Sequence, residues 1–191
     1  FMLVSTNPAF WDDLNEKFYR KYYWLDRQHH IWKETVLAGK PIQGPLGRAW
    51  SIKIHRDFKN ELKIPWTTLS NYPVQGTGAD VMMLARLSAK RRIQQEGIQC
   101  DWISTVHDSI VLDVPNMDDL IRLRDLFDGV FKDIPQNIQA LFGYKWDVPM
   151  ASESKYGPNM LDMKKFTWKQ SFTLINTLLN QIKKKTKLIL Y

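Results

Sequence analysis

Hydrophobic and polar positions in the first part of the chain alternate in steps of three and four. The pattern begins after Asn7-Pro8, which favours a helix start because asparagine caps the first turn and proline is tolerated there. The spacing predicts a long amphipathic helix with room for one break, ended by Gly-Lys-Pro at residues 39–41. Its apolar or aromatic positions are Phe10, Leu14, Phe18, Tyr22, Leu25, His29, Trp32 and Val36.

The next part of the chain mixes turn formers with periodic segments. Residues 42–56 contain two glycines and a proline and predict a loop or short hairpin. Residues 71–77 predict a loop that opens a helix over residues 78–96. Asp80 suits the first turn of that helix because the helix dipole favours an anion there, and Gly97 is a natural C-cap.

Two runs of strand-forming residues, 102–106 and 110–114, flank His107 and Asp108. They predict a β-hairpin with the His-Asp pair at its bend, ended by Pro115. A clear amphipathic helix follows, with Asn116 or Asp118 as its cap.

The last part of the chain gives weaker signals. Residues 148–152 predict one more strand, and Tyr-Gly-Pro-Asn at 156–159 predicts a turn. Apolar positions over residues 172–182 keep helical spacing. The sequence therefore predicts an α+β fold, with an antiparallel sheet around the His-Asp hairpin, long helices packed on one face, and a basic helical tail.

Composition narrows the class of protein. A chain of 191 residues with 44% hydrophobic content can bury a core. The single cysteine, Cys100, excludes an internal disulfide framework and a cysteine-built zinc site. Because no apolar run approaches the roughly 18 residues of a membrane-spanning helix, we expect no membrane contact and a cytoplasmic location, in the host cytoplasm if the protein is viral.

The net charge of +7 is unevenly distributed. Residues 160–191 hold seven lysines and one acid, Asp162, so the rest of the chain is nearly neutral. A basic character confined to the tail is no argument that the whole chain binds nucleic acid. The lysine cluster fits a DNA contact, a partner contact or a solubility feature.

The residues of the hairpin bend, and Gln75 upstream of it, each leave several interpretations open. An aspartate at a bend usually forms the turn, but a carboxylate held on a rigid hairpin also suits a hard divalent cation. His107 fits a packed core position as well as a contact with a substrate. Gln75 fits a helix cap as well as a hydrogen bond to a ligand.

Two motifs favour the ligand-binding interpretation of these residues over the structural one. The sequence N-Y-P-V-Q-G-T-G-A-D at residues 71–80 resembles the N-x-P-x-Q-G-x-x-A-D element of family A (polymerase I-like) DNA polymerases. The sequence V-H-D-S-I-V at 106–111 resembles the third polymerase motif of that family, at a matching separation. The segment that ends in Arg48, and residues 148–159, are similar to other parts of the family. The resemblance covers residues 8 to about 160.

The resemblance implies template-directed transfer of a nucleotide from a dNTP to a primer 3′-hydroxyl, with two Mg²⁺ (or Mn²⁺) ions. Asp108 then supplies a metal ligand, and His107 contacts the primer terminus. Asn71 and Gln75 bind primer and template near the last base pair, where carboxamides suit the nearly uniform minor-groove acceptors. Arg48 neutralises backbone phosphates.

The chain also departs from the family. The first motif, D-[YF]-S-x-I-E-x-R with the other metal-binding aspartate, and the second, with the nucleotide-binding helix, are absent from the 191 residues. Ser109 replaces the usual acid, and residues 161–191 extend past the family's usual end. Because the chain also begins without methionine, we expect the C-terminal piece of a split, phage-like polymerase.

The partner of that piece would carry the first two motifs, the thumb and an exonuclease, and would share both metal ions. It would also place a strand beside the hairpin, whose sheet is otherwise incomplete. Within the chain, we expect residues 1–56 to end the fingers, 57–160 to form the C-terminal half of the palm, and 161–191 to form the basic helical extension. The alternative is a non-catalytic nucleic acid-binding or structural subunit with a palm fold.

Overall fold

The computed structural model describes residues 6–166 and, for the backbone alone, residues 186–190. The chain divides into two compact units between Gly76 and Thr77. Each unit is described by itself. Among the described helices, none is long and apolar enough to cross a membrane.

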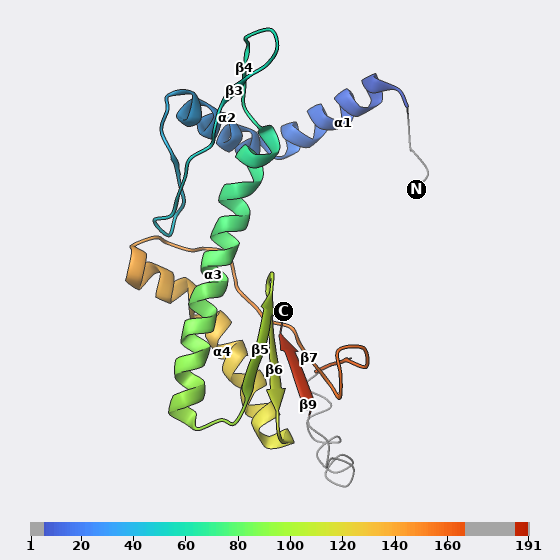
Figure 1. Cartoon of the computed structure of the whole chain (residues 1–191), viewed down its shortest axis with the longest axis vertical. Helices are drawn as coiled ribbons and strands as arrows, with labels where there is room; N and C mark the ends of the chain where they lie inside the picture. Colours follow the sequence, from blue (N-terminus) through green and yellow to red (C-terminus); the bar gives the residue numbers. More distant parts are fainter. Residues whose placement is uncertain (1–5, 167–185, 191) are drawn as a thin grey trace. The chain divides into compact units, whose positions relative to one another are not determined.

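The first unit begins with two consecutive helices, α1 (Pro8–Lys21) and α2 (Tyr23–Leu37) (Figure 1). The Asn7 side chain accepts a hydrogen bond from the Ala9 backbone N–H at 3.0 Å and caps α1. Tyr22 breaks the helical pattern with a ψ of 52°. The predicted start, the single break and the end before residues 39–41 are confirmed.

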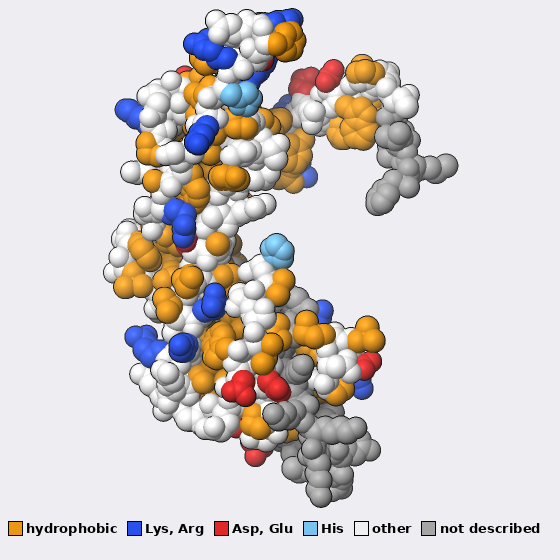
Figure 2. Space-filling view, viewed as in Figure 1, with side chains coloured by type: hydrophobic (Ala, Val, Ile, Leu, Met, Phe, Trp, Pro, Cys, Tyr) orange, Lys and Arg blue, Asp and Glu red, His pale blue; other side chains and the backbone are white. Residues whose placement is uncertain are grey.

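Helix α1 carries an apolar face that no described residue covers. None of its residues is buried, and Figure 2 shows hydrophobic side chains gathered over this helix. The exposed members of this face are Phe10, Trp11, Leu14 and Phe18, with Tyr22 at its end. The hydrophobic spacing thus predicted a helix correctly, but its apolar positions lie on the surface of the first unit.

Two short antiparallel hairpins follow the helices. Strand β1 (Ile42–Gln43) pairs with β2 (Ala49–Trp50), and β3 (His55–Arg56) pairs with β4 (Leu62–Lys63). The first hairpin confirms the prediction for residues 42–56, and the second was not predicted. The core of the unit consists of Val36, Ile42, Ile52 and Leu69, with Trp32, Trp50, Ile54 and Ile64 packed against it.

A single helix, α3 (Trp66–Glu96), contains the whole segment that was predicted to open as a loop. That prediction was wrong: residues 71–77 are helical, and Pro73 lies inside the helix. A proline removes one backbone hydrogen bond, but packing on either side can maintain a long helix. Here Leu69, before the proline, and Val81, after it, are both buried. The helix ends before Gly97, whose φ of +64° fits the predicted C-cap.

The second unit is built on a five-stranded sheet with the order β5-β6-β9-β7-β8 (Figure 1). Every neighbouring pair is antiparallel. The bounds are β5 (Asp101–Val106), β6 (Ser109–Val114), β7 (Ser154–Gly157), β8 (Lys164–Lys165) and β9 (Thr186–Leu190). The described part of the chain is thus α+β, as predicted.

Helix α4 (Met117–Phe142) packs against this sheet. Its cap is Asn116, one of the two predicted residues, whose side chain accepts a hydrogen bond from the Asp119 N–H at 2.8 Å. The Phe127 ring meets Trp102 of β5 at a centroid distance of 6.4 Å. The core of the unit contains fully buried residues from β6 and α4, including Ile110, Leu112, Val114, Leu120, Leu123, Phe127 and Ile134.

Three predictions for the C-terminal part of the chain need correction. Residues 148–152 form no strand, because Pro149 lacks a backbone donor; the strand begins at Ser154. Tyr156 and Gly157 belong to that strand, so the predicted turn begins only at Pro158. The predicted helical tail is a strand over Thr186–Leu190, where its backbone pairs with β6 and β7. The positions predicted to be helical, 172–182, lie outside the described residues.

Candidate active site

His107 and Asp108 form the two-residue turn that joins β5 to β6, where Val106 pairs with Ser109. His107 has a φ of +53°, in the left-handed region. A side chain in this region usually costs about 1 kcal/mol or more, and such residues are concentrated at functional sites. Both turn residues are exposed. The hairpin therefore presents an imidazole and a carboxylate at its tip.

Ser109 holds the turn closed from the strand side. Its hydroxyl donates a hydrogen bond to the Val106 carbonyl at 2.7 Å, and the residue is only 6% exposed. A hydroxyl that points back into the hairpin is not available to a ligand beside Asp108. The position where the related family has an acid therefore stabilises the turn in this chain.

The described residues contain no cluster of three or more His, Cys, Asp or Glu side chains that could hold a metal ion. The donor chemistry of Asp108 still fits a hard divalent cation, because an exposed carboxylate offers oxygen ligands. Within the described part of the chain, Asp108 does not by itself make up a metal site.

Asn71 and Gln75 lie one turn apart on α3, so their side chains share a face of the helix. Both are exposed. They belong to the first unit, whereas His107 and Asp108 belong to the second. The structure thus brings the predicted residues together as two pairs, one on a helix face and one at a hairpin turn.

Arg48 is exposed next to the turn of the β1–β2 hairpin, where its carbonyl accepts a hydrogen bond from the Gly44 N–H at 2.7 Å. The following strand ends in Trp50, whose indole ring lies against Gly76 of α3. A Cβ atom at residue 76 would come within 2.8 Å of the indole Nε1. This contact holds the hairpin of Arg48 against the helical turn that contains Gln75.

The contact between Trp50 and Gly76 was not predicted from the sequence. The signal was present, because a glycine in the interior of a helix is unfavourable unless another group needs the space. The local pattern placed Gly76 in a loop. In the structure it leaves room for the indole ring instead.

Arg92, one of several arginines along α3, has a structural partner. Its guanidinium donates to the Asp133 carboxylate of α4 at 2.6 Å. The pair ties the two helices of the second unit together.

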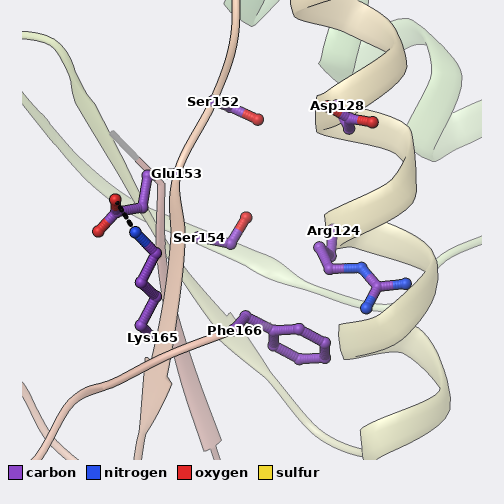
Figure 3. A pocket seen from close by; sticks show the side chains of 7 residues that line it. All are labelled: Arg124, Asp128, Ser152, Glu153, Ser154, Lys165 and Phe166. Atoms are coloured by element: carbon purple, nitrogen blue, oxygen red, sulfur yellow. Dashed lines mark hydrogen bonds and ion pairs between the residues drawn. The ribbon is translucent and has the colours of Figure 1, made fainter. Parts of the chain in front are cut away.

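A cavity of about 310 Å³ lies between α4 and strands β7 and β8 (Figure 3). The Arg124 guanidinium stacks on the Phe166 ring at 4.7 Å and donates to the Asp125 carboxylate. The Lys165 ammonium donates to Glu153 at 2.6 Å, a hydrogen bond that lowers the pKa of that carboxyl. None of the predicted site residues lines this cavity. The Lys165–Glu153 pair links β8 to the segment that precedes β7.

The fold and site define an α+β protein with an exposed carboxylate suited to metal-dependent chemistry, and comparison with known proteins gives its family. The family model for DNA polymerase family A matches residues 10–162, so the chain belongs to DNA polymerase family A.

Individual relatives agree with this assignment. DNA polymerase I of Aquifex aeolicus (strain VF5) is 24% identical over 143 residues, covering 70% of this chain and 23% of the relative. The DNA polymerase of Bacillus phage SP01 is 29% identical over 161 residues, covering 79% of this chain and 17% of the relative. DNA polymerase I of Pseudomonas aeruginosa (strain PAO1) is 35% identical over 106 residues, covering 52% and 11%. The chain spans less than a quarter of the length of each of these relatives.

Proposed function

We propose that this chain supplies one metal-binding aspartate and the primer–template contacts of a DNA-directed DNA polymerase. The observation that carries the proposal is the exposed His107-Asp108 turn in a chain of family A. In this proposal residues 1–56 end the fingers, 57–160 form the C-terminal half of the palm, and 161–191 extend it.

Asp108 acts as the metal ligand. Two divalent ions, Mg²⁺ or Mn²⁺, would activate the primer 3′-hydroxyl and stabilise the leaving pyrophosphate. The rigid two-stranded hairpin fixes the Asp108 carboxylate without help from a flexible loop. His107 is adjacent to it in the turn, which suits a contact with the primer terminus.

Asn71, Gln75 and Arg48 bind the DNA. The two carboxamides lie on one exposed helix face, where each offers both a donor and an acceptor to base edges. Such groups read minor-groove acceptors without strong preference for a base pair, which a polymerase requires. The always-charged guanidinium of Arg48 suits a backbone phosphate.

The remaining active-site parts come from a second polypeptide. Asp108 belongs to no cluster of three or more His, Cys, Asp or Glu side chains among the described residues, and the position after it is a buried serine. A two-metal site needs at least one more carboxylate to hold both ions. We propose that the partner carries the first-motif aspartate, the nucleotide-binding helix and the thumb.

Primer extension tests the proposal. The assay combines this chain, a primer–template, dNTPs and Mg²⁺, with or without a second polypeptide that carries the first aspartate motif. We expect extension only with both polypeptides. Strong extension by this chain alone would refute the split arrangement.

The variant Asp108→Asn tests the metal ligand in the same assay. Loss of a carboxylate ligand removes several kcal/mol of charge stabilisation, so we expect extension to fall more than about 100-fold while the complex still assembles. Asp147→Asn, at another exposed aspartate of the second unit, is the matched control and should leave extension unchanged.

The alternative is a non-catalytic nucleic acid-binding subunit that kept the fold, and Ser109 in place of an acid favours it. That alternative predicts primer–template binding with no effect of Asp108→Asn on extension.

A further inference from the structure

The hairpin formed by β3 and β4 projects from the first unit (Figure 1). Its two strands pair antiparallel, and residues 57–61 form the turn between them. Ile54, before the hairpin, and Ile64, after it, both pack against the hydrophobic core of the unit. The base of the hairpin is therefore fixed by apolar contacts, while its turn lies in solvent.

Side chains of the hairpin itself hold this turn in place. The Asp57 carboxylate accepts hydrogen bonds from the backbone N–H groups of Lys59 at 2.8 Å and Glu61 at 3.0 Å. The Asp57 backbone N–H donates to the Glu61 carbonyl at 2.9 Å. The Arg56 guanidinium donates to the Asn60 carbonyl at 2.8 Å. The turn thus presents its remaining side chains in a defined orientation.

Phe58 lies uncovered in this fixed turn. It is 93% exposed, which is the largest exposed fraction among the large hydrophobic side chains described. The Lys59 ammonium lies 5.8 Å from the centre of its ring. A single exposed apolar side chain is common on protein surfaces. The ring of Phe58 is set apart because a rigid turn holds it and cations surround it.

The hairpin and its flanks are basic. Residues 53–63 contain four lysine or arginine residues and two acids, and Figure 2 shows Lys and Arg side chains gathered over the hairpin. Lys63 lies 3.6 Å from Asp57 and 3.4 Å from Glu61, so it is balanced by acids. Among the described residues, Arg56 and Lys59 take part in no ion pair. Two cations next to the exposed ring therefore keep their charge for an anionic partner.

The hairpin belongs to the unit that holds the proposed DNA contacts. In the chain it lies between Arg48 and Asn71, and all three are part of the first unit. Strand β4 leads through residues 64–65 directly into α3, the helix that carries Asn71. A nucleic acid is thus the partner that the rest of this unit already suits.

The chemistry of the turn favours a single strand over a duplex or a protein. An aromatic ring can stack on a base while nearby cations contact the phosphates. Inside a duplex the faces of the bases are covered by neighbouring base pairs, so they are closed to such a ring. A protein partner would need a larger apolar area with few charges at its centre. In the hairpin the exposed large apolar side chains are Phe58 and Leu62, with charged residues around them.

We propose that the β3–β4 hairpin binds single-stranded DNA, with Phe58 stacked on a base and with Arg56 and Lys59 on neighbouring phosphates. This inference rests on the proposed function, since it takes DNA as the nucleic acid. The unpaired part of the template is the strand that would reach this surface. The hairpin would hold that strand without preference for sequence, because every base has a face on which a ring can stack.

The first experiment titrates the intact chain with an oligodeoxythymidylate of about eight nucleotides. Affinity is read from the amide NMR signals of residues 55–63, so binding to other parts of the chain is measured separately. We expect these signals to shift, and a blunt-ended DNA duplex to bind at them at least about tenfold more weakly. Shifts that spare residues 55–63, or equal affinity for the duplex, would overturn the proposal.

Variants of the exposed ring test stacking. Phe58→Ala and Phe58→Leu should each weaken binding at least about fivefold, whereas Phe58→Trp should retain it, because leucine is apolar but has no ring. Trp24→Ala is the matched control, since Trp24 is another exposed aromatic residue of the first unit, and it should leave affinity within about twofold. Unchanged binding by Phe58→Leu, or an equal loss in Trp24→Ala, would refute stacking on Phe58.

The salt dependence of the same titration tests the phosphate contacts. Lys59→Gln should reduce the slope of log Kd against log salt concentration by about 0.7, because one phosphate contact is lost. Phe58→Ala should weaken binding and leave the slope unchanged, because stacking releases no counterion. A slope that Lys59→Gln does not alter would overturn the phosphate contact.

The proposal and the proposed function can fail separately, since none of these titrations requires DNA synthesis or the second polypeptide. Binding at residues 55–63 without extension by the assembled complex would refute the proposed function alone. Extension without binding at these residues would refute the hairpin site alone. Shifts at residues 55–63 caused by the second polypeptide in place of the oligonucleotide would make the hairpin a protein contact and would also overturn the proposal.

Discussion

Gly76→Ala tests whether a close helix–hairpin contact positions Gln75. The added Cβ would lie within 2.8 Å of the Trp50 indole Nε1, so the ring or the helix must shift. Overpacking of this kind costs about 1–3 kcal/mol. In a helix interior, the change from glycine to alanine also contributes about 1 kcal/mol of stability. We therefore expect a net loss of about 1 kcal/mol in the free energy of unfolding.

Gly78→Ala is the matched control, because Gly78 lies in the same helix and a Cβ there meets nothing within 4 Å. This variant should gain about 1 kcal/mol. The difference between the unfolding free energies of the two variants cancels the helix stabilisation that alanine gives to both. What remains is the steric cost of the contact with Trp50, about 1–3 kcal/mol. The assay is urea denaturation followed by the helical circular dichroism signal.

A third variant assigns the cost to its cause. In a Trp50→Leu background the ring is absent, so the difference between the Gly76 and Gly78 variants should shrink to less than about 0.5 kcal/mol. Equal stability of Gly76→Ala and Gly78→Ala in the natural background would refute the contact. A difference that persists after the Trp50→Leu substitution would also refute it.

Three further predictions concern single interactions. Ser109→Ala removes the hydrogen bond to Val106 and should lower the free energy of unfolding, measured by urea denaturation, by about 1 kcal/mol. Primer extension by the complex should stay within about twofold of the unsubstituted chain. Loss of extension would instead give Ser109 a role at the metal site. Burial lowers the pKa of His29 below its ordinary value of 6.5, so the unfolded chain binds more protons and stability should fall as the pH drops below about 6.5. His29→Phe should flatten that dependence in thermal unfolding measured from pH 5 to 8, and an unchanged slope would contradict the assignment. Arg92→Met should lower the free energy of unfolding by about 0.5 kcal/mol, because its ion pair with Asp133 is partly exposed. A loss above about 2 kcal/mol would show that the pair does more than join two helices.

The sequence predicted those elements whose signals are local. Asn7 and Asn116 cap helices because their side chains reach backbone N–H groups two or three residues away. Gly97 ends a helix because it adopts a positive φ easily. These interactions depend on neighbours along the chain, so the residue type alone identifies them.

The failures have a common physical cause in tertiary contacts. Pro73 and Gly76 signal a loop locally, yet packing of Leu69 on one side and Val81 on the other keeps the segment helical. The strand at Thr186–Leu190 falls within the extension that was predicted to be helical, but it pairs with β6 and β7, which lie far away in the sequence. Neither outcome can be inferred from hydrophobic spacing.

The candidate site likewise contains residues that the sequence identified and contacts that only the structure shows. The motif at 106–111 drew attention to His107 and Asp108, and both are exposed at a hairpin turn. The hydrogen bond that commits Ser109 to the turn, and the indole ring beside Gly76, are contacts that only the fold reveals. The metal-binding role of Asp108 remains a prediction.

Mn²⁺ binding tests that role most directly. The complex of this chain with the second polypeptide and a primer–template is titrated with Mn²⁺, and amide signals of this chain are followed by NMR. We predict paramagnetic broadening centred on residues 106–109 that Asp108→Asn abolishes and Asp147→Asn preserves. Broadening that spares the hairpin turn, or that survives Asp108→Asn, would contradict a metal-binding aspartate at this position.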